Sequence, residues 1–389
     1  LPIYDQVSWY ADGSPHTLPD DFYSSKYFID KTIEFVASNE DSDQPFFAYI
    51  PFQAVHIPVQ APKEYSDKYA GVYDEGWSVM REKRRQTAVA LGVIPKESEI
   101  KVTPGTIDWS SMTDEQRRYD ARRMEVYAGM VDAMDFHIGR LMDYLKSIDE
   151  YENTVFIFTS DNGAASSPLL DSDGNSVLKN WFDRVGYNTD YESLGEKGSW
   201  VAIGPGNASI ANSPLLYYKF HANEGGLRVP LIISGPGINR HGEITDEFTF
   251  VTDLAPTILN LTGTTEHRGK FNGREVEPIV GVSFTDYLNG AADQIHQPSE
   301  SIGYELGGSN ALFKGDYKIV INKIEQNETE WHLYNIKTDP GETTDLINEK
   351  PQLFAEMLSE YESWAEENNV LPMPQGYNRG RAIFRNGFN

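Results

Sequence analysis

Polar residues that could do chemistry directly follow an apolar run in the segment Thr154–Gly163, which reads TVFIFTSDNG. The run combines β-branched and aromatic side chains without interruption, which predicts a strand buried on both faces. Open α/β sheets bind ligands at the carboxyl ends of their strands. Asp161 and Asn162 stand at that end, where their oxygens suit a divalent cation such as Ca²⁺ or Mg²⁺. An Asn-Gly pair after a strand also indicates a tight turn, and this segment alone does not separate the two interpretations.

Two cationic side chains elsewhere are suited to contacting an anion. His56 lies in Pro51–Pro58, just past a short apolar run, where an imidazole can act as an acid, a base or an anion contact. Lys219 lies among aromatic residues in Leu216–Phe220, where a charge on a long stem suits an oxyanion. The alternatives are a surface loop histidine and a lysine that only covers apolar surface. Arg228 is expected to pair with a carboxylate.

The elements that must position these residues alternate between strand and helix. Phe46–Ile50 is a short apolar run that ends at a proline, which predicts a buried strand. Thr113–Gln116 matches a capping box, and apolar residues then recur every three or four positions, which predicts a long amphipathic helix. That helix leads into the strand at Thr154, and a helix followed by a buried strand predicts a parallel sheet. Val229–Ser234 predicts another strand, and Thr252–Gly263 predicts another helix.

The pattern changes after about residue 297. Turn residues such as Lys314-Gly-Asp316 separate short strand patterns, which is typical of antiparallel hairpins, and a helical stripe follows over Gln352–Asn368. The predicted strands are Ser301–Leu306, Asn310–Lys314, Tyr317–Ile321 and Glu330–Asn335. We therefore expect an α/β domain over residues 1–297 and a C-terminal α+β domain, with an antiparallel sheet and a helix, over residues 298–389.

Composition limits the classes of partner. The 389 residues carry a formal net charge of −26, which argues against nucleic acid and against an anionic membrane surface. No run of eighteen apolar residues occurs, so no membrane span is expected. The chain has no cysteine, which excludes disulfides and a thiol nucleophile and leaves the compartment undecided. It begins at Leu1 without an initiator Met or a signal-peptide pattern, so we expect it to be cut from something longer.

Together these segments resemble the sulfatase family of the alkaline-phosphatase-like superfamily, most closely its bacterial arylsulfatase branch. The resemblance covers nearly the whole chain, and its motifs occur in the family's order. They are the His-x-Pro segment at His56, the helix Glu125–Asp135, Ser160–Gly163, Lys219 six residues before Gly225-Gly226, Arg228–Pro230, Asp253–Leu259 and Leu333–Leu346. The resemblance implies an alkaline-phosphatase-like α/β fold with a mixed, mainly parallel sheet flanked by helices and a smaller C-terminal α+β domain.

The resemblance also implies a function: a sulfuric ester hydrolase of the arylsulfatase type that acts on a small-molecule or saccharide sulfate ester. In that family Asp161 and Asn162 would supply two oxygen ligands to one Ca²⁺, for which Mg²⁺ is the weaker alternative. His56 and Lys219 would hold the sulfate and help the leaving oxygen to depart, as substrate-binding and catalytic residues. The attacking group would be the hydrate of a formylglycine made from the Cys or Ser of a Cys/Ser-x-Pro-x-Arg motif.

The chain departs from the family at this nucleophile, because it contains no Cys/Ser-x-Pro-x-Arg segment. The family's first Asp-Asp metal pair is missing too, since Asp20-Asp21 follows no strand. We expect that the family's N-terminal segment with the nucleophile is absent, which would leave an unpaired sheet edge and uncovered apolar surface. The chain alone is then expected to be inactive, and sticky or bound to its missing segment. Two alternatives stay open: a phosphonate or phosphodiester hydrolase of the same superfamily, and a non-catalytic binding protein derived from a sulfatase.

Overall fold

The computed structural model describes residues 8–40, 42, 44–167, 186–264, 269–323, 328–374 and 377. The chain divides into two compact units, each assembled from separate stretches of sequence. The first unit holds Leu1–Arg81, Thr103–Glu152 and Ala164–Ala211, and the second holds Glu82–Val102, Asn153–Gly163 and Asn212–Asn389. Among the helices of the described ranges, none combines the length and the apolar character that crossing a membrane requires.

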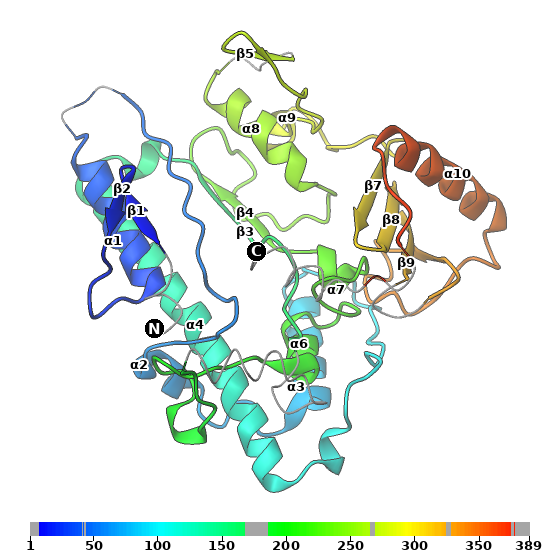
Figure 1. Ribbon diagram of the computed structural model, residues 1–389. Coiled ribbons are helices and arrows are strands. Elements are labelled where there is room, and N and C mark those ends of the chain that lie inside the picture. The colour runs from blue at the N-terminus through cyan, green and yellow to red at the C-terminus, as the bar shows by residue number, and fades with distance from the viewer. Residues whose placement is uncertain are drawn as a thin grey trace. The chain divides into compact units, whose positions relative to one another are not determined.

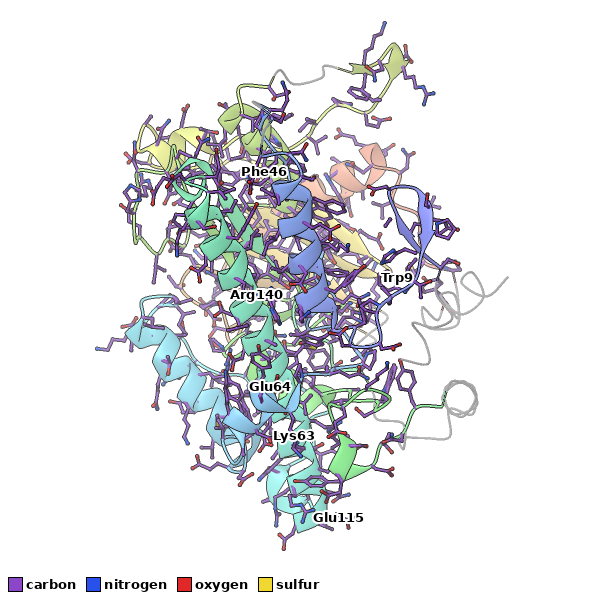
Figure 2. All side chains as sticks on the ribbon, turned by 90° about the vertical axis from the view of Figure 1, so that its left-hand side faces the viewer. Trp9, Phe46, Lys63, Glu64, Glu115 and Arg140 are labelled. Atoms are coloured by element: carbon purple, nitrogen blue, oxygen red, sulfur yellow. The ribbon has the colours of Figure 1, made fainter. Side chains whose placement is uncertain are left out.

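The first unit is organised around the long helix α4 (Asp114–Ser147), and α1 (Ser24–Ala37) lies alongside it (Figures 1 and 2). The predicted capping box is confirmed: the Thr113 hydroxyl accepts from the Gln116 N–H at 3.2 Å, and the Gln116 side chain accepts from the Thr113 N–H at 2.9 Å. Arg140 of α4, labelled in Figure 2, forms an ion pair of 2.7 Å with Asp30 of α1. The remaining elements that begin in this unit are β1 (Trp9–Ala11), β2 (Ser14–His16), α2 (Lys63–Ser66), η2 (Asp67–Tyr69), α3 (Gly76–Ala90), η3 (Trp109–Ser111), η4 (Tyr151–Asn153), η5 (Tyr191–Ser193) and α6 (Gly204–Ala211).

The predicted strand over Phe46–Ile50 is wrong. The segment has no regular secondary structure, and the side chains of Phe46, Phe47 and Tyr49 are 41%, 74% and 80% exposed. An apolar run forms a strand only where a neighbouring strand accepts its backbone hydrogen bonds. In the part of the chain that the structure describes, no strand pairs with this segment.

The predicted strands at Thr154 and Val229 exist in the second unit as β3 (Phe156–Thr159) and β4 (Leu231–Ser234). They pair with each other and run antiparallel, with Thr159 opposite Leu231, so the expected parallel arrangement is wrong for this pair. That expectation needed a strand before α4, and the segment expected to form it is not a strand. In the described part of the chain no other strand flanks this pair, and β3 is only half-buried. The neighbouring elements are α7 (Glu224–Leu227), η6 (Val251–Asp253), α8 (Leu254–Leu261), β5 (Lys270–Phe271), β6 (Arg274–Glu275) and α9 (Thr285–Asn289).

The predicted antiparallel strands near the C-terminus are confirmed. They form a four-stranded sheet in the order β10-β9-β8-β7, and α10 (Pro351–Glu367) packs against it (Figure 1). The strands are β7 (Ser301–Leu306), β8 (Ser309–Lys314), β9 (Tyr317–Asn322) and β10 (His332–Asn335). Gly315 has a φ of +53° in the two-residue connection between β8 and β9, a conformation that glycine adopts easily. Between sheet and helix lies a core that includes Leu312, Ile319, Leu333, Met357 and Tyr361.

The His296 imidazole links Asp253, at the start of α8, to Glu300, just before β7. His296 Nε2 lies 2.8 Å from the buried Asp253 carboxylate, and its Nδ1 lies 3.0 Å from Glu300. The hydrogen bond to Asp253, helped by Glu300, outweighs burial and raises the pKa of His296 above its ordinary 6.5. The protonated imidazole is therefore favoured in the folded chain over the unfolded one.

This raised pKa predicts a pH-dependent stability. The stabilisation is fully present below pH 6.5 and is lost as the pH rises through the higher folded-state pKa. Replacing His296 with Gln should therefore lower the free energy of unfolding by about 1–2 kcal/mol in mildly acidic buffer, and by less in alkaline buffer. Urea unfolding across this range measures the difference, with the exposed His241→Gln as the control. A difference from wild type that stays the same at every pH would contradict the prediction.

Candidate functional site

The Asp-Asn-Gly segment follows β3 directly, as predicted. Residues 161–163 form a bend without a hydrogen-bonded turn, and within the described ranges the next strand after β3 is β4. The Ser160 hydroxyl donates to the Asn162 carbonyl at 2.9 Å, which holds the backbone, and the Asn162 side chain bonds to none of the described residues. Asp161 is exposed, and in the described ranges its carboxylate makes no hydrogen bond or ion pair. Both side-chain oxygens at the strand end are therefore available to a ligand.

Lys219 lies in a compact segment that precedes β4, the lysine turn (Leu216–Leu227). The turn is closed by the Gly225 N–H, which donates to the Leu216 carbonyl at 2.9 Å, and by the ring of His221, which stacks on Tyr217 at 4.4 Å. The Lys219 side chain is half-buried, with its ammonium 5.5 Å from the centroid of the Phe220 ring. Within the described residues no carboxylate pairs with this ammonium. A half-buried cation without a protein counter-ion suits an anionic ligand better than the alternative of a solvated surface lysine.

A backbone contact joins the Asp-Asn-Gly segment to the lysine turn. The Gly163 N–H donates to the Gly226 carbonyl at 3.0 Å. Asn212 holds the lysine turn closed, because its side-chain amide donates to the carbonyls of Gly225 at 2.7 Å and Tyr217 at 3.1 Å. Gly163 has no room for a side chain, since a Cβ there would overlap the Gly225 carbonyl oxygen. The two segments are thus fixed to each other at backbone level.

Gly163→Ala should separate these segments or strain them. Overpacking of this kind costs about 1–3 kcal/mol, and we expect that loss in the free energy of unfolding measured with urea. The control is Gly139→Ala in α4, where a Cβ would meet no atom within 4 Å and where alanine is the better helix former. Equal stability of Gly163→Ala and wild type would contradict the close approach of Gly163 to the Gly225 carbonyl oxygen.

A buried ionic cluster lies under the lysine turn. The Lys318 ammonium is fully buried and lies 2.8 Å from the Glu224 carboxylate and 2.6 Å from the Glu342 carboxylate. Lys318 also donates to the Ala222 carbonyl at 3.2 Å, and Glu342 accepts from the Glu224 N–H at 2.9 Å. Burial favours the neutral form of Lys318, but the two carboxylates outweigh it and raise its pKa; burial raises the pKa of Glu342. The cluster therefore holds both ends of the Ala222–Glu224 backbone, just after Lys219.

The predicted pairing of Arg228 is confirmed. Its guanidinium lies 3.5 Å from the Glu224 carboxylate and 3.4 Å from the Ile336 carbonyl, to which it donates. Arg228 therefore pairs with a member of the ionic cluster, and its role is structural.

His56 lies in the first unit and is exposed, as expected for a loop histidine. Its Nδ1 lies 2.9 Å from the Ile57 carbonyl oxygen. A carbonyl can only accept, so Nδ1 carries the proton in this contact. Nε2 is then the ring nitrogen that can exchange a proton with a ligand.

Asp161 and Asn162 are the type of ligand that calcium binds, but two residues supply too few oxygens for a complete site. A carboxylate and an amide oxygen are hard donors of the type that Ca²⁺ prefers, and Ca²⁺ takes about six to eight of them. Within the described ranges, no group of three or more His, Cys, Asp or Glu side chains is arranged to hold a metal ion. Asp161 and Asn162 can therefore form only part of a coordination sphere.

Of the four predicted site residues, the second unit brings three onto two connected segments: Asp161 and Asn162 on one, Lys219 on the other. His56 belongs to the first unit, and its approach to the other three stays a prediction. Sequence reasoning missed the ionic partners Lys318 and Glu342. Lys318 could have been noticed, because it interrupts the apolar pattern of a strand that reads YKIVIN.

Comparison with known proteins agrees with these features. The family model described as Sulfatase matches residues 3–264. An uncharacterised sulfatase from Schizosaccharomyces pombe is 38% identical over 373 residues, which are 94% of this chain and 66% of that protein. An arylsulfatase from Klebsiella aerogenes is 34% identical over 275 residues, which are 70% of this chain and 58% of that protein. The chain thus spans less than two thirds of the length of these relatives.

Solved structures support the fold. The crystal structure of Ps i-CgsB in complex with k-i-k-neocarrahexaose superposes with a TM-score of 0.59 at 19% identity. The superposition covers 98% of this chain and 63% of that one. The α/β fold expected from the resemblance is therefore that of solved sulfatases, with helices and a C-terminal antiparallel sheet. On the extent of the family match and the identity to its relatives, the chain belongs to the sulfatase family.

Proposed function

We propose that this chain is part of a sulfuric ester hydrolase of the arylsulfatase type in which Asp161, Asn162, Lys219 and His56 line the ester site. The observation that carries the proposal is the backbone contact between Gly163 and Gly226. It joins two oxygen donors to a half-buried lysine, and none of the three side chains pairs with another of the described residues. Anion recognition by a cation next to a metal-binding segment is the arrangement that transfer of a sulfuryl group requires.

Each side chain has a distinct role in this proposal. Asp161 and Asn162 would be two of the oxygen ligands of Ca²⁺, which supplies positive charge to the sulfate when bound. The Lys219 ammonium neutralises a sulfate oxygen as negative charge shifts during the reaction. His56 Nε2 donates a proton to the leaving oxygen, since its Nδ1 is held by the Ile57 carbonyl.

The nucleophile in this proposal is a formylglycine from a Cys/Ser-x-Pro-x-Arg motif, which the 389 residues do not contain. The chain by itself then holds part of the active site and should hydrolyse no sulfate ester. The whole protein is, in this proposal, the chain joined to a segment that carries the motif. The complex of Ps i-CgsB with an oligosaccharide supports a saccharide as one carrier of the sulfate group.

The test compares esters and proteins. The whole protein should hydrolyse 4-nitrophenyl sulfate with a higher kcat/KM than bis(4-nitrophenyl) phosphate, and the 389-residue chain alone should hydrolyse neither. Faster hydrolysis of the phosphodiester would show that the protein is a phosphodiesterase of the same superfamily and not a sulfatase. Turnover of the sulfate by the chain alone would show that the nucleophile is another group, and no turnover by the whole protein would favour a binding protein.

A further inference from the structure

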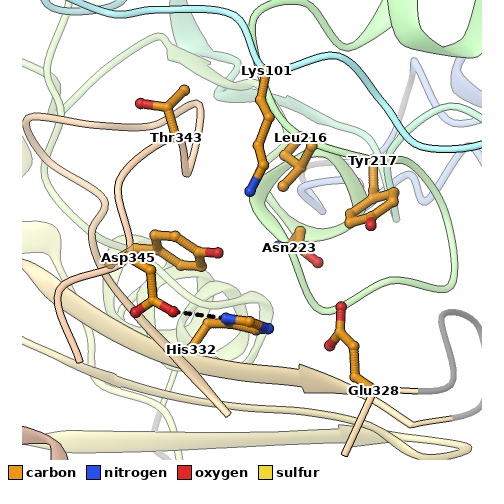
Figure 3. Close-up of a pocket in the computed structure, with 9 residues that line it drawn as sticks. Lys101, Leu216, Tyr217, Asn223, Glu328, His332, Thr343 and Asp345 are labelled. Atoms are coloured by element: carbon orange, nitrogen blue, oxygen red, sulfur yellow. Dashed lines mark hydrogen bonds and ion pairs between the residues drawn. The ribbon is translucent and has the colours of Figure 1, made fainter. Parts of the chain in front are cut away.

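A small polar cavity lies in the second unit between the lysine turn and the C-terminal sheet, with a volume of about 210 Å³ (Figure 3). Leu216, Tyr217 and Asn223 of the turn form one wall, so the cavity and Lys219 share a structural element. Its remaining lining residues are Lys101, Glu328, His332, Tyr334, Thr343 and Asp345. In Figure 3 the Lys101 ammonium and the Glu328 carboxylate point toward its interior from opposite sides.

The charged and polar walls of this cavity are held in place by hydrogen bonds. The Glu328 carboxylate accepts from the Asn322 N–H at 2.6 Å, and the Asn322 side chain donates to Asn223 at 2.7 Å. His332 Nδ1 lies 2.8 Å from the Asp345 carboxylate, which also accepts from the Leu333 N–H at 3.1 Å. Such preorganised polar groups are what a binding site needs.

The ionisation of Asp345 determines which ring nitrogen of His332 carries a proton. Burial disfavours a charged Asp345, but the hydrogen bonds from His332 and from backbone N–H groups outweigh it and lower its pKa. The ionised carboxylate can only accept, so His332 Nδ1 carries the proton. Nε2 is then the ring nitrogen left to contact a ligand.

Two tyrosines place their rings in the core and line the cavity. Tyr217 is 7% exposed and Tyr334 is 3% exposed. Neither hydroxyl makes a hydrogen bond to another of the described residues, so both can bond to a molecule in the cavity. Burial raises the pKa of Tyr217 to about 12 and shifts that of Tyr334 in the same direction, so both stay neutral and can donate as well as accept. These hydroxyls point to a ligand that forms hydrogen bonds.

The charge of the walls selects among hydrogen-bonding ligands. The single cation, Lys101, is offset by Glu328 and by the ionised Asp345, so the cavity has no excess of positive charge for a sulfate or phosphate group. Drug-sized ligands occupy about 300–1,000 Å³, so this cavity suits one small ring. A sugar ring carries several neutral hydroxyls, each both donor and acceptor, which matches the mixture of tyrosine, carboxylate, imidazole and ammonium groups.

We propose that this cavity binds one uncharged pyranose residue of a saccharide. The inference rests on the proposed function and narrows it, because it assigns the substrate to saccharide sulfates that carry an unsulfated sugar beside the sulfated one. Tyr217 and Tyr334 would bond to ring hydroxyls, Glu328 and His332 Nε2 would accept from them, and Lys101 would donate.

Binding can be measured without hydrolysis, by saturation-transfer NMR titration of the 389-residue chain with methyl β-D-galactopyranoside and methyl β-D-glucopyranoside. We expect millimolar binding of at least one of them. Tyr334→Phe and Glu328→Gln should each weaken it by about 3–10-fold, the effect of one lost hydrogen bond. Tyr334→Phe removes a hydroxyl that has no protein partner and should leave the fold intact, which circular dichroism checks. Tyr317→Phe, in the same sheet but outside the cavity, is the matched control and should bind like wild type.

Three results would overturn the proposal: no binding of either pyranoside at tens of millimolar, unchanged affinity in both variants, or binding of only glycine in the same titration. The proposed function fails separately, because it depends on hydrolysis by the whole protein. Pyranoside binding without sulfate ester turnover would support the sugar site and contradict the sulfatase reaction. Turnover without pyranoside binding would support the sulfatase reaction and contradict the sugar site.

Discussion

Lys219→Ala should lower kcat/KM of the whole protein for 4-nitrophenyl sulfate by about 10²–10³-fold, the usual effect of removing one group that stabilises charge in a transition state. The half-buried ammonium has no carboxylate partner in the described residues, so its charge is available to the sulfate. Because charge on the sulfate and the leaving oxygen changes most in the transition state, we expect the loss mainly in kcat. Initial rates over a range of substrate concentrations separate kcat from KM.

The control for this variant is Lys337→Ala in the same unit. Its side chain is 47% exposed, and its ammonium lies 3.7 Å from the Asp246 carboxylate. A surface pair of this kind contributes little, so Lys337→Ala should keep wild-type rates. A Lys219→Ala protein that is as stable and as active as this control would remove Lys219 from the reaction.

Lys318→Met should have the largest effect on folding. It leaves the carboxylates of Glu224 and Glu342 buried without their cation, and removing one partner of a buried ion pair costs about 3–5 kcal/mol. The side chain is also the anchor of the Ala222–Glu224 backbone, so this loss should be accompanied by loosening of the lysine turn. Urea unfolding at neutral pH, followed by tryptophan fluorescence, measures the free energy of unfolding.

Two further variants test the cause of that loss. Lys314→Met in the adjacent strand removes a cation whose two partners, Glu356 and Glu360, are 57% and 35% exposed, and it should cost about 1 kcal/mol, less than Lys318→Met. Adding Glu224→Gln and Glu342→Gln to Lys318→Met removes the uncompensated charges and should recover part of the stability. If Lys318→Met were no less stable than Lys314→Met, the buried cluster would have no part in holding the turn.

The C-terminal sheet could be predicted from the sequence almost to the residue. Each of its strands is bounded by turn residues, and the Gly315-Asp316 connection fixes the pairing of β8 with β9. The capping box at Thr113 likewise marked the start of α4. These signals are local, and local hydrogen bonds and turn geometry decide the structure there.

The run Phe46–Ile50 and the direction of β3 could not be predicted, because both depend on partners distant in the sequence. An apolar run gives no information about which strand lies beside it. The same limit applies to the site: Asp161 and Lys219 could be recognised singly, but the contact between Gly163 and Gly226 spans more than sixty residues. The ion pair of Lys318 with Glu224, 94 residues apart, is equally invisible before folding.

Calcium dependence tests most directly whether the two oxygen donors after β3 and the neighbouring lysine turn form a sulfate ester site. The measurement is the rate of 4-nitrophenyl sulfate hydrolysis by the whole protein after chelation and after return of Ca²⁺, alongside the double variant Asp161→Ala, Asn162→Ala. Chelation should abolish the wild-type rate and Ca²⁺ should restore it, whereas the double variant should stay inactive at the same Ca²⁺ concentration. A chelated protein with its full rate, or a double variant as active and as calcium-dependent as wild type, would contradict the assignment.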